Sequence, residues 1–222
     1  MDKLVSIIIR TYNEQKHVDK LLRSIFEQNF SKEKLQVIIV DSGSTDSTLE
    51  YARKYPVELL HIRPEDFTFG YSLNRGIEHA KGDYIIMISA HCHPMDKDWI
   101  SNLIKPFEKD QKIGVVYGKQ RGKDTSKYSE HQIFKTWFPE KADSRQNTPF
   151  CNNANCAIKK SLWEKHRYNE KLTGLEDLEW AKEIIKMGYL VYYQPEAGIY
   201  HIHNETYSQV YNRYRREAIA IK

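Results

Sequence analysis

The fold is decided by residues 4–14, which read LVSIIIRTYNE. Leu4–Ile9 is a continuous apolar run rich in β-branched residues, which is typical of a strand buried on both faces of a parallel sheet. Polar residues follow at Thr11–Glu14, and the same order recurs at Leu35–Val40 followed by Asp41–Asp46. Both polar clusters therefore stand at the carboxyl ends of predicted strands, where open α/β sheets bind their ligands.

Strand and helix patterns alternate along the chain up to Tyr117. From Asn13, a good N-cap, apolar residues recur with helical spacing as far as Phe26. The order of elements predicts an α/β fold with a mostly parallel central sheet and helices on both faces. The other expected strands are 57–62, 84–88, 113–117, 155–158 and 189–193, and the other expected helices are 46–52, 72–81, 99–107, 175–187 and 207–221.

A long polar segment interrupts the alternation from Gly118 to Pro149. A connection of this length inside a compact domain is usually functional or mobile. The chain has 222 residues, of which 40% are hydrophobic and 29% charged, and this is enough for one sizeable core. We therefore expect one domain over residues 1–222.

Composition limits the partners and the location. The net charge of +4 is mild and the basic residues do not form one long run, which argues against nucleic acid as the main partner. No apolar stretch approaches the ~20 residues of a membrane-spanning helix, and Met1–Arg10 lacks a secretory pattern. The expected location is the cytoplasm, with peripheral association at the inner face of the membrane compatible with the sequence.

Three cysteines, Cys92, Cys151 and Cys156, cannot all pair with one another. With His91 and His93 they raise the alternative of a zinc site, but their spacing is a loose match to structural zinc patterns. Buried reduced thiols are the better interpretation.

The two polar clusters offer groups that a nucleoside needs. Asp41 could accept hydrogen bonds from ribose hydroxyls or from the imide N–H of uracil or thymine, and Gly43 would let the backbone approach the ligand. The alternative is that Asn13, Ser44 and Asp46 only cap helices. Two such clusters at consecutive strand ends favour the binding interpretation.

With these motifs the chain resembles the family 2 glycosyltransferases of the Rossmann-like GT-A fold. In that family one strand ends in Thr-Tyr-Asn-Glu and the next in Val-Asp-Ser-Gly-Ser-Thr-Asp, which here are residues 11–14 and 40–46. The further matching motifs are Asn74–Gly76, Gly82–Tyr84, Asn153–Asn155 and Glu176–Asp177. The resemblance implies a nucleotide-sugar-binding half at residues 1–117 and an acceptor-binding and catalytic half at residues 118–222.

The resemblance also implies roles for single residues. Asp177 would be the general base that removes a proton from the acceptor hydroxyl, and Glu176 would orient the site. Acidic residues in a first helical turn also suit the helix dipole, which is the alternative explanation for this pair. The residues implied to bind the nucleotide sugar are Thr11, Tyr12, Asn13, Glu14, Asp41, Ser42, Gly43, Asn74, Arg75, Ser89 and His91.

The sequence departs from the family at its Asp-x-Asp metal motif, where Ser89, Ala90 and His91 stand. The resemblance implies a divalent metal cofactor, Mn²⁺ or Mg²⁺, whereas the missing carboxylates argue against it, above all for Mg²⁺, which prefers oxygen ligands. His91 could bind a softer ion such as Mn²⁺, contact the phosphates directly, or be an ordinary polar residue. In the family a histidine after the last strand often completes the metal site, and His201 is expected in that position.

The acceptor is assigned to residues near the predicted base. Trp180 lies three residues after Asp177 on the same side of the helix and could stack on a sugar ring, with core packing as the alternative. Asn153 and Asn155 are assigned to the acceptor from the resemblance. The charge that develops on the leaving diphosphate must be met by cations, and the candidates are Arg75, Arg213, Arg215 and Arg216.

The sequence thus predicts an inverting glycosyltransferase. It would move a sugar from a UDP or dTDP donor to a hydroxyl of a glycan or lipid-linked acceptor in surface polysaccharide synthesis. One rival is a sugar nucleotidyltransferase, which would carry a Gly-rich basic loop after the first strand, unlike Thr11–Lys16. The other is a catalytically silent nucleotide- or glycan-binding domain, which Ser89–His91 favours and Asp177 opposes.

Overall fold

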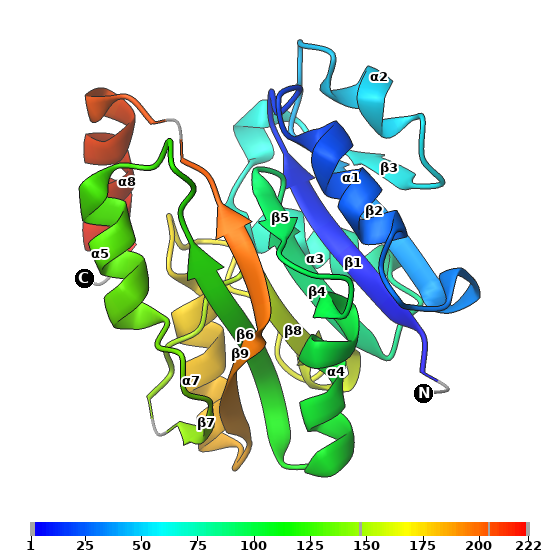
Figure 1. The fold of residues 1–222 in the computed structure, drawn as a ribbon, viewed down its shortest axis with the longest axis vertical. Helices are drawn as coiled ribbons and strands as arrows, with labels where there is room; N and C mark the ends of the chain where they lie inside the picture. Colours follow the sequence, from blue (N-terminus) through cyan, green and yellow to red (C-terminus); the bar gives the residue numbers. More distant parts are fainter. Residues whose placement is uncertain (1–2, 147, 204, 221–222) are drawn as a thin grey trace.

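The computed structural model describes residues 3–146, 148–203 and 205–220, and one sheet runs through its centre (Figure 1). The strands follow the order β3-β2-β1-β4-β8-β6-β9-β5, and β7 pairs with β9. The strands are β1 Val5–Thr11, β2 Leu35–Asp41, β3 Glu58–His61, β4 Tyr84–Ser89, β5 Cys92–Pro94, β6 Ile113–Arg121, β7 Asp143–Gln146, β8 Asn155–Lys159 and β9 Leu190–His201. The α-helices are α1 Val18–Phe26, α2 Thr48–Ala52, α3 Phe69–His79, α4 Trp99–Lys109, α5 Tyr128–Trp137, α6 Lys160–Trp163, α7 Glu176–Lys186 and α8 Tyr207–Ala220.

The strands pair in both directions, so the α/β class is confirmed while the sheet is mixed. β3, β2, β1 and β4 form a parallel block, as the alternation of strands and helices predicts. β8 runs antiparallel to both β4 and β6, and β6 pairs parallel to β9. Apolar runs show that a strand is buried but not which way it runs, which is why the sequence did not reveal the reversal at β8.

Each face of the sheet carries its own core. On one face Ile7 and Ile9 of β1 pack with residues of α1 and α4, and on the other Ile8 packs with residues of α3 and α7. Figure 1 shows α1 and α4 in front of the sheet and α3 behind it. Successive residues of a strand point to opposite faces, so a continuous apolar run buries both. The packing on both faces holds the strands in place, so that the polar residues at the carboxyl ends of β1, β2 and β4 lie at the same edge of the sheet.

Several local predictions differ from the structure. Asn13 is not an N-cap: its φ is 55°, and α1 begins at Val18. The region of Pro195 reads as a turn in the sequence, but β9 continues through it to His201. A register shift in the pairing with β6, between Gly118 and Gln120, accommodates this region within the strand. The polar segment from Gly118 contains α5 and β7, and the short β5 and α6 were not predicted. All three cysteines are free and buried, as expected.

Candidate active site

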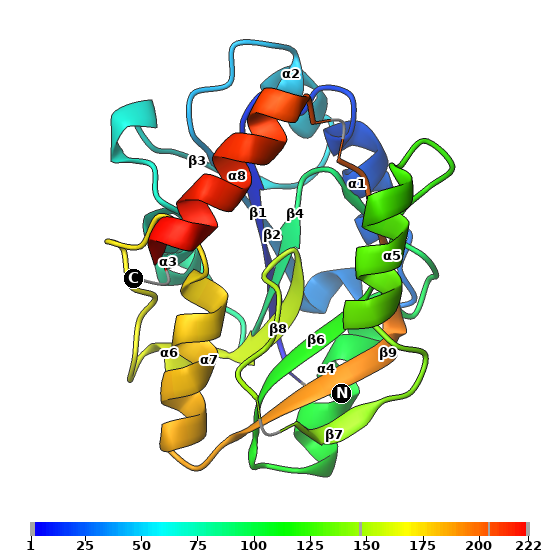
Figure 2. The ribbon, with the colours of Figure 1, turned by 90° about the vertical axis from the view of Figure 1, so that its left-hand side faces the viewer.

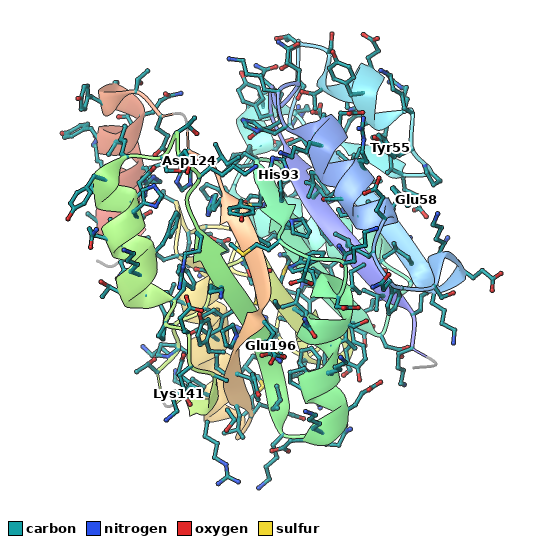
Figure 3. All side chains as sticks on the ribbon, in the orientation of Figure 1. Tyr55, Glu58, His93, Asp124, Lys141 and Glu196 are labelled. Atoms are coloured by element: carbon teal, nitrogen blue, oxygen red, sulfur yellow. The ribbon has the colours of Figure 1, made fainter. Side chains whose placement is uncertain are left out.

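A cavity of about 640 Å³ lies at the carboxyl edge of β1 and β4. Its walls come from α5, from the N-terminus of α7 and from α8, and Figure 2 looks onto this side of the molecule, where the three helices surround the strand ends. Volumes of this size are typical of small-molecule sites. Lining residues from both halves of the chain include Arg10, His91, Asp177, His201 and Arg213.

Glu176 and Asp177 open α7 and line the cavity. Leu175 precedes them in the left-handed conformation with φ 60°, a costly state for a branched residue that turns the chain sharply into the helix. The backbone N–H groups of Asn153 and Leu178 donate to the Asp177 carboxylate at 3.2 and 2.9 Å. The Asn153 side chain donates to Glu176 at 3.2 Å. Two neighbouring carboxylates are thus held in place by fixed donors.

Burial and a neighbouring like charge raise the pKa of Asp177 towards neutral pH. Its side chain is among the buried groups at 8% exposure, and Glu176 is at 4%. Burial, followed by the charge of Glu176, raises the pKa of Asp177 to about 7, although the two backbone donors and Arg10 act the other way. Arg10 lies 3.8 Å from Glu176 and so offsets part of the negative charge. A carboxylate with this pKa can accept a proton near neutral pH.

Three histidines line the same cavity and lie next to one another. Nδ1 of His91 lies 2.8 Å from the Glu14 carboxylate, and Nδ1 of His201 lies 2.7 Å from the side-chain oxygen of Gln120. With both Nδ1 atoms donating, both Nε2 atoms carry lone pairs, yet these two atoms are only 3.1 Å apart. His203 completes the cluster, its ring centroid 4.0 Å from that of His201.

This histidine cluster, His91 with His201 and His203, fits a divalent ion. Burial lowers the pKa of His201 well below 6.5 and that of His203 to about 4, which keeps both rings neutral as ligands. Two nitrogens each about 2.1 Å from one ion stand roughly 3.0–3.4 Å apart, which agrees with the observed separation. Imidazole suits transition ions, and Mg²⁺ prefers oxygen. The residues present therefore fit Mn²⁺ or a similar transition ion better than Mg²⁺.

A known protein family matches most of this chain. The model of the family described as Glycosyl transferase family 2 matches residues 6–167. The chain belongs to glycosyltransferase family 2.

Relatives agree with this membership, and a solved structure shares the fold. The O-antigen chain rhamnosyltransferase RfbN of Salmonella typhimurium is 30% identical over 95% of this glycosyltransferase chain and 70% of its own length. A Methanococcus voltae relative is named dolichyl N-acetyl-alpha-D-glucosaminyl phosphate 3-beta-D-2,3-diacetamido-2,3-dideoxy-beta-D-glucuronosyltransferase. It is 36% identical over 49% of this chain and 35% of its own length. The mannosyltransferase PcManGT of Pyrobaculum calidifontis, solved with GDP-Man and Mn²⁺, has a TM-score of 0.78 at 23% identity. That match covers 100% of this chain and 62% of PcManGT, and it shows the GT-A fold.

Some cavity residues were missed by sequence reasoning. Glu130 and Glu205 offer oxygens beside His203 and could share an ion with it. For His203, which was not assigned to the site from the sequence, the available signal was its position two residues after His201, because residues two apart in an extended segment share a face. Arg10 is a further missed residue: it lines the cavity, and its buried Nη1 atom has no hydrogen-bond partner among the described residues.

The predicted cationic groups divide between the cavity and the surface. Arg213 and Arg216 of α8 line the cavity, and Arg213 pairs with Glu205 at 2.8 Å. Arg215 is not among the lining residues. Arg75 pairs with Glu78 at 2.6 Å and is not among the residues that line the cavity, so its assignment to the diphosphate side stays a prediction.

The two polar clusters after β1 and β2 do lie together. Thr11 donates to Asp41 at 3.1 Å, and the side-chain oxygen of Asn13 accepts from the backbone of Thr45 at 2.8 Å. Asp41 also accepts from the backbone N–H of Gly43 at 3.0 Å, and Gly43 has a φ of 94° that only glycine adopts easily. These residues, with Tyr12 and Ser42, lie outside the cavity lining. Their contact with a nucleoside stays a prediction.

Three assigned residues are structural instead. Trp180 is 1% exposed and donates to the His166 carbonyl at 2.6 Å, so core packing is correct and sugar stacking is wrong. Asn74 is 1% exposed and bonds to Tyr168 and Trp163, which places it outside any phosphate contact. Asn155 is fully buried and cannot reach an acceptor. Asn153 lines the cavity and positions the two carboxylates.

Replacing Asn155 by alanine is expected to lower the free energy of unfolding by about 2–4 kcal/mol. Its oxygen accepts from the Trp99 indole at 2.9 Å, and its amide donates to the carbonyls of Ala197 and Lys119. The substitution leaves these buried groups unsatisfied. Urea unfolding measures the loss. As a control, Asn102→Ala removes one exposed bond and should change stability by less than about 0.5 kcal/mol; equal losses for both variants would contradict the role of Asn155.

In the part of the chain that the structure describes, every helix is too short or too polar to cross a membrane.

Proposed function

We propose that this family 2 member is an inverting transferase that uses a nucleoside-diphosphate sugar, with a pyrimidine diphosphate such as UDP or dTDP as the favoured carrier. The observation that carries the proposal is that two kinds of group line one cavity. Asp177, a buried carboxylate with a pKa of about 7, lines it together with the histidine cluster and Arg213. The carboxylate suits proton removal, and the histidines and the guanidinium suit a diphosphate.

The reaction follows from this arrangement. The donor diphosphate lies against the histidine cluster and the guanidinium groups of Arg213 and Arg216. An acceptor hydroxyl lies at Asp177 and attacks the anomeric carbon as its proton passes to the carboxylate. The bond from that carbon to the diphosphate oxygen breaks, and the nucleoside diphosphate leaves with the electron pair. A single displacement from the opposite side inverts the anomeric configuration.

The leaving group sets the electrostatic demand. Negative charge grows on the departing diphosphate oxygen, and preorganised cations stabilise it. His91, His201 and His203 would hold a divalent ion, which would supply further positive charge to the departing diphosphate. Within the chain itself, Glu14 and Gln120 fix the orientation of His91 and His201, and Arg213 is fixed by Glu205.

The acceptor class follows the relatives. RfbN is named an O-antigen chain rhamnosyltransferase, and the Methanococcus relative is named for a dolichyl-linked saccharide. The proposed acceptor is accordingly a hydroxyl of a glycan or lipid-linked saccharide in surface polysaccharide synthesis. A lipid-linked acceptor would place the reaction at the inner face of the membrane.

Titration calorimetry tests the donor half of the proposal. UDP, dTDP, GDP and CMP are each titrated with Mn²⁺, with Mg²⁺ and with chelator. The expected result is binding of one nucleoside diphosphate that is strengthened by Mn²⁺ more than by Mg²⁺. Lack of binding to all four under every condition would refute the proposed donor class.

The rate of sugar transfer is expected to rise with pH through about 7. Asp177 works as a base only when ionised, so kcat/KM should fall about tenfold per pH unit below that pKa and level off above it. Initial rates from about pH 5.5 to 8.5 in buffers of constant ionic strength measure the profile. A profile that stays flat over this range would contradict Asp177 as the base.

A further inference from the structure

A second cavity, of about 600 Å³, adjoins the first and shares lining residues with it. We call it the aromatic cavity, because the rings of Tyr117, Trp137, Phe150 and Tyr193 line it. Asp177 and Trp137 line both cavities and so stand at their boundary. The carboxylate that lines the first cavity together with the histidine cluster therefore also borders the second.

The rings of the aromatic cavity hold one another in fixed orientations. Phe150 meets Trp137 at 73° with 5.7 Å between centroids, and it meets Tyr117 at 82° and 5.5 Å. The Tyr117 hydroxyl donates to Gln146 and the Tyr193 hydroxyl to the Pro139 carbonyl, both at 2.6 Å. Edge-to-face contacts and anchored hydroxyls leave a preformed wall of ring surface.

Trp137 is the exposed member of this wall. It is 50% exposed, whereas Trp99, Trp163 and Trp180 are at most 3% exposed. When a flat apolar surface covers a half-exposed indole, the indole loses its contact with water, and this burial favours binding. The C–H face of a pyranose ring has this shape and also presents hydroxyls at its rim.

The charges around the aromatic cavity restrict what enters it. Asp143, Asp177 and Glu217 are among its lining residues, and none of the described residues that line it is lysine or arginine. The first cavity differs, because Arg10, Lys127, Arg213 and Arg216 line it. An anionic sugar or a phosphate group would meet only carboxylates in the aromatic cavity, so a neutral saccharide is favoured there.

From these observations we propose that the aromatic cavity is the acceptor site, where an uncharged saccharide ring stacks on Trp137 and directs one hydroxyl at Asp177. The inference rests on the proposed function and adds the place and the charge class of the acceptor. A phosphate of a lipid-linked acceptor lies outside this cavity, and the sugar that receives the new bond lies inside it. The donor and the acceptor thus approach Asp177 from different cavities.

Fluorescence tests binding without turnover. Because the other three tryptophans are buried, quenching by acrylamide reports on Trp137. The probes are the methyl glycosides of rhamnose, mannose, galactose and N-acetylglucosamine, and the methyl glycoside of glucuronic acid, each with UDP and Mn²⁺ present. At least one neutral glycoside is expected to reduce the quenching constant about twofold or more, and the glucuronide is expected to leave it unchanged. Protection by none of the neutral glycosides, or equal protection by the glucuronide, would overturn the proposal.

Substitution of Trp137 provides the kinetic arm. Trp137→Ala is expected to raise the acceptor KM about tenfold or more, with a smaller change in the donor KM, and Trp137→Phe should recover part of the loss. Tyr128→Ala is the matched control, because Tyr128 lies on the same helix, is 79% exposed and lines neither cavity. An acceptor KM for Trp137→Ala equal to that of the control would overturn the acceptor site. Absence of nucleotide binding by the unchanged protein would instead refute the proposed function.

Discussion

Replacement of Asp177 by asparagine is expected to slow sugar transfer by about 10²–10⁴-fold. The amide matches the carboxylate in size and can keep a hydrogen bond from the backbone of Leu178, but it cannot take the proton of an acceptor hydroxyl. Binding of the nucleoside diphosphate should change little, because its proposed contacts are the histidine cluster and the arginines rather than Asp177. Release of nucleoside diphosphate under saturating donor and acceptor measures the rate, and calorimetry measures the binding.

The same substitution is expected to raise stability although it lowers the transfer rate. A stability measurement therefore distinguishes loss of the base from loss of the fold. The pKa of Asp177 is about 7 in the folded chain and about 3.9 in an unfolded one, so the folded state binds the proton more tightly. The stability contributed by the neutral carboxyl is present at low pH and is lost as pH rises through about 7. Asp177→Asn should therefore melt at a higher temperature than the unchanged protein at pH 8. A variant that transfers sugar at the unchanged rate would remove Asp177 from the mechanism.

Replacement of His201 by alanine is expected to lower the affinity for Mn²⁺ by more than the roughly 10–100-fold that loss of an outer partner costs. His201 is buried at 6% exposure and its Nε2 faces that of His91 at 3.1 Å, so its loss removes a ligand from the centre of the cluster. Glu14→Gln tests the outer partner of His91 and should show the smaller loss. The readout is free Mn²⁺ by electron paramagnetic resonance, which needs no turnover.

A matched histidine variant controls for surface binding. His79→Ala removes an exposed imidazole at the end of α3 and should leave Mn²⁺ affinity unchanged. Equal affinity of His201→Ala and His79→Ala would contradict the metal site. In that case the side-chain amide of Gln120 would be flipped, so that its NH₂ group donates to Nδ1 of His201. The Nε2–H group of His201 would then donate a hydrogen bond to Nε2 of His91.

Much of the fold could be predicted because it depends on local pattern. The apolar runs of β1, β2 and β4 and the helical spacing of α1 and α4 each match a core face. β9 was predicted only in its first part, since Pro195 and Gly198 are turn residues in isolation and tertiary pairing with β6 overrides them. The reversal of β8 depends on how a long connection returns to the sheet, which local pattern does not encode.

The site was predictable where a motif stands at a strand or helix end. Asp177 and His91 both line the cavity, because they stand at the ends of α7 and β4, and their roles in catalysis and binding stay predictions. Trp180 was misplaced because one helical turn separates it from Asp177 while its ring points into the core. Trp137 could be named from the sequence, with Tyr128 and Phe138, as an aromatic residue that shapes the acceptor pocket. That it lines one cavity together with Asp177 depends on how α5 packs against Phe150, which local pattern does not encode.

The most direct test of the central claim is the configuration of the sugar that the protein releases. The chain is incubated with Mn²⁺ and an α-linked nucleoside-diphosphate sugar, and the first sugar product, including that formed by attack of water, is followed by proton nuclear magnetic resonance before mutarotation. The expected result is nucleoside diphosphate together with the β anomer, formed at a rate that depends on Asp177. Release of the α anomer, or no cleavage of any UDP, dTDP or GDP sugar, would contradict the account.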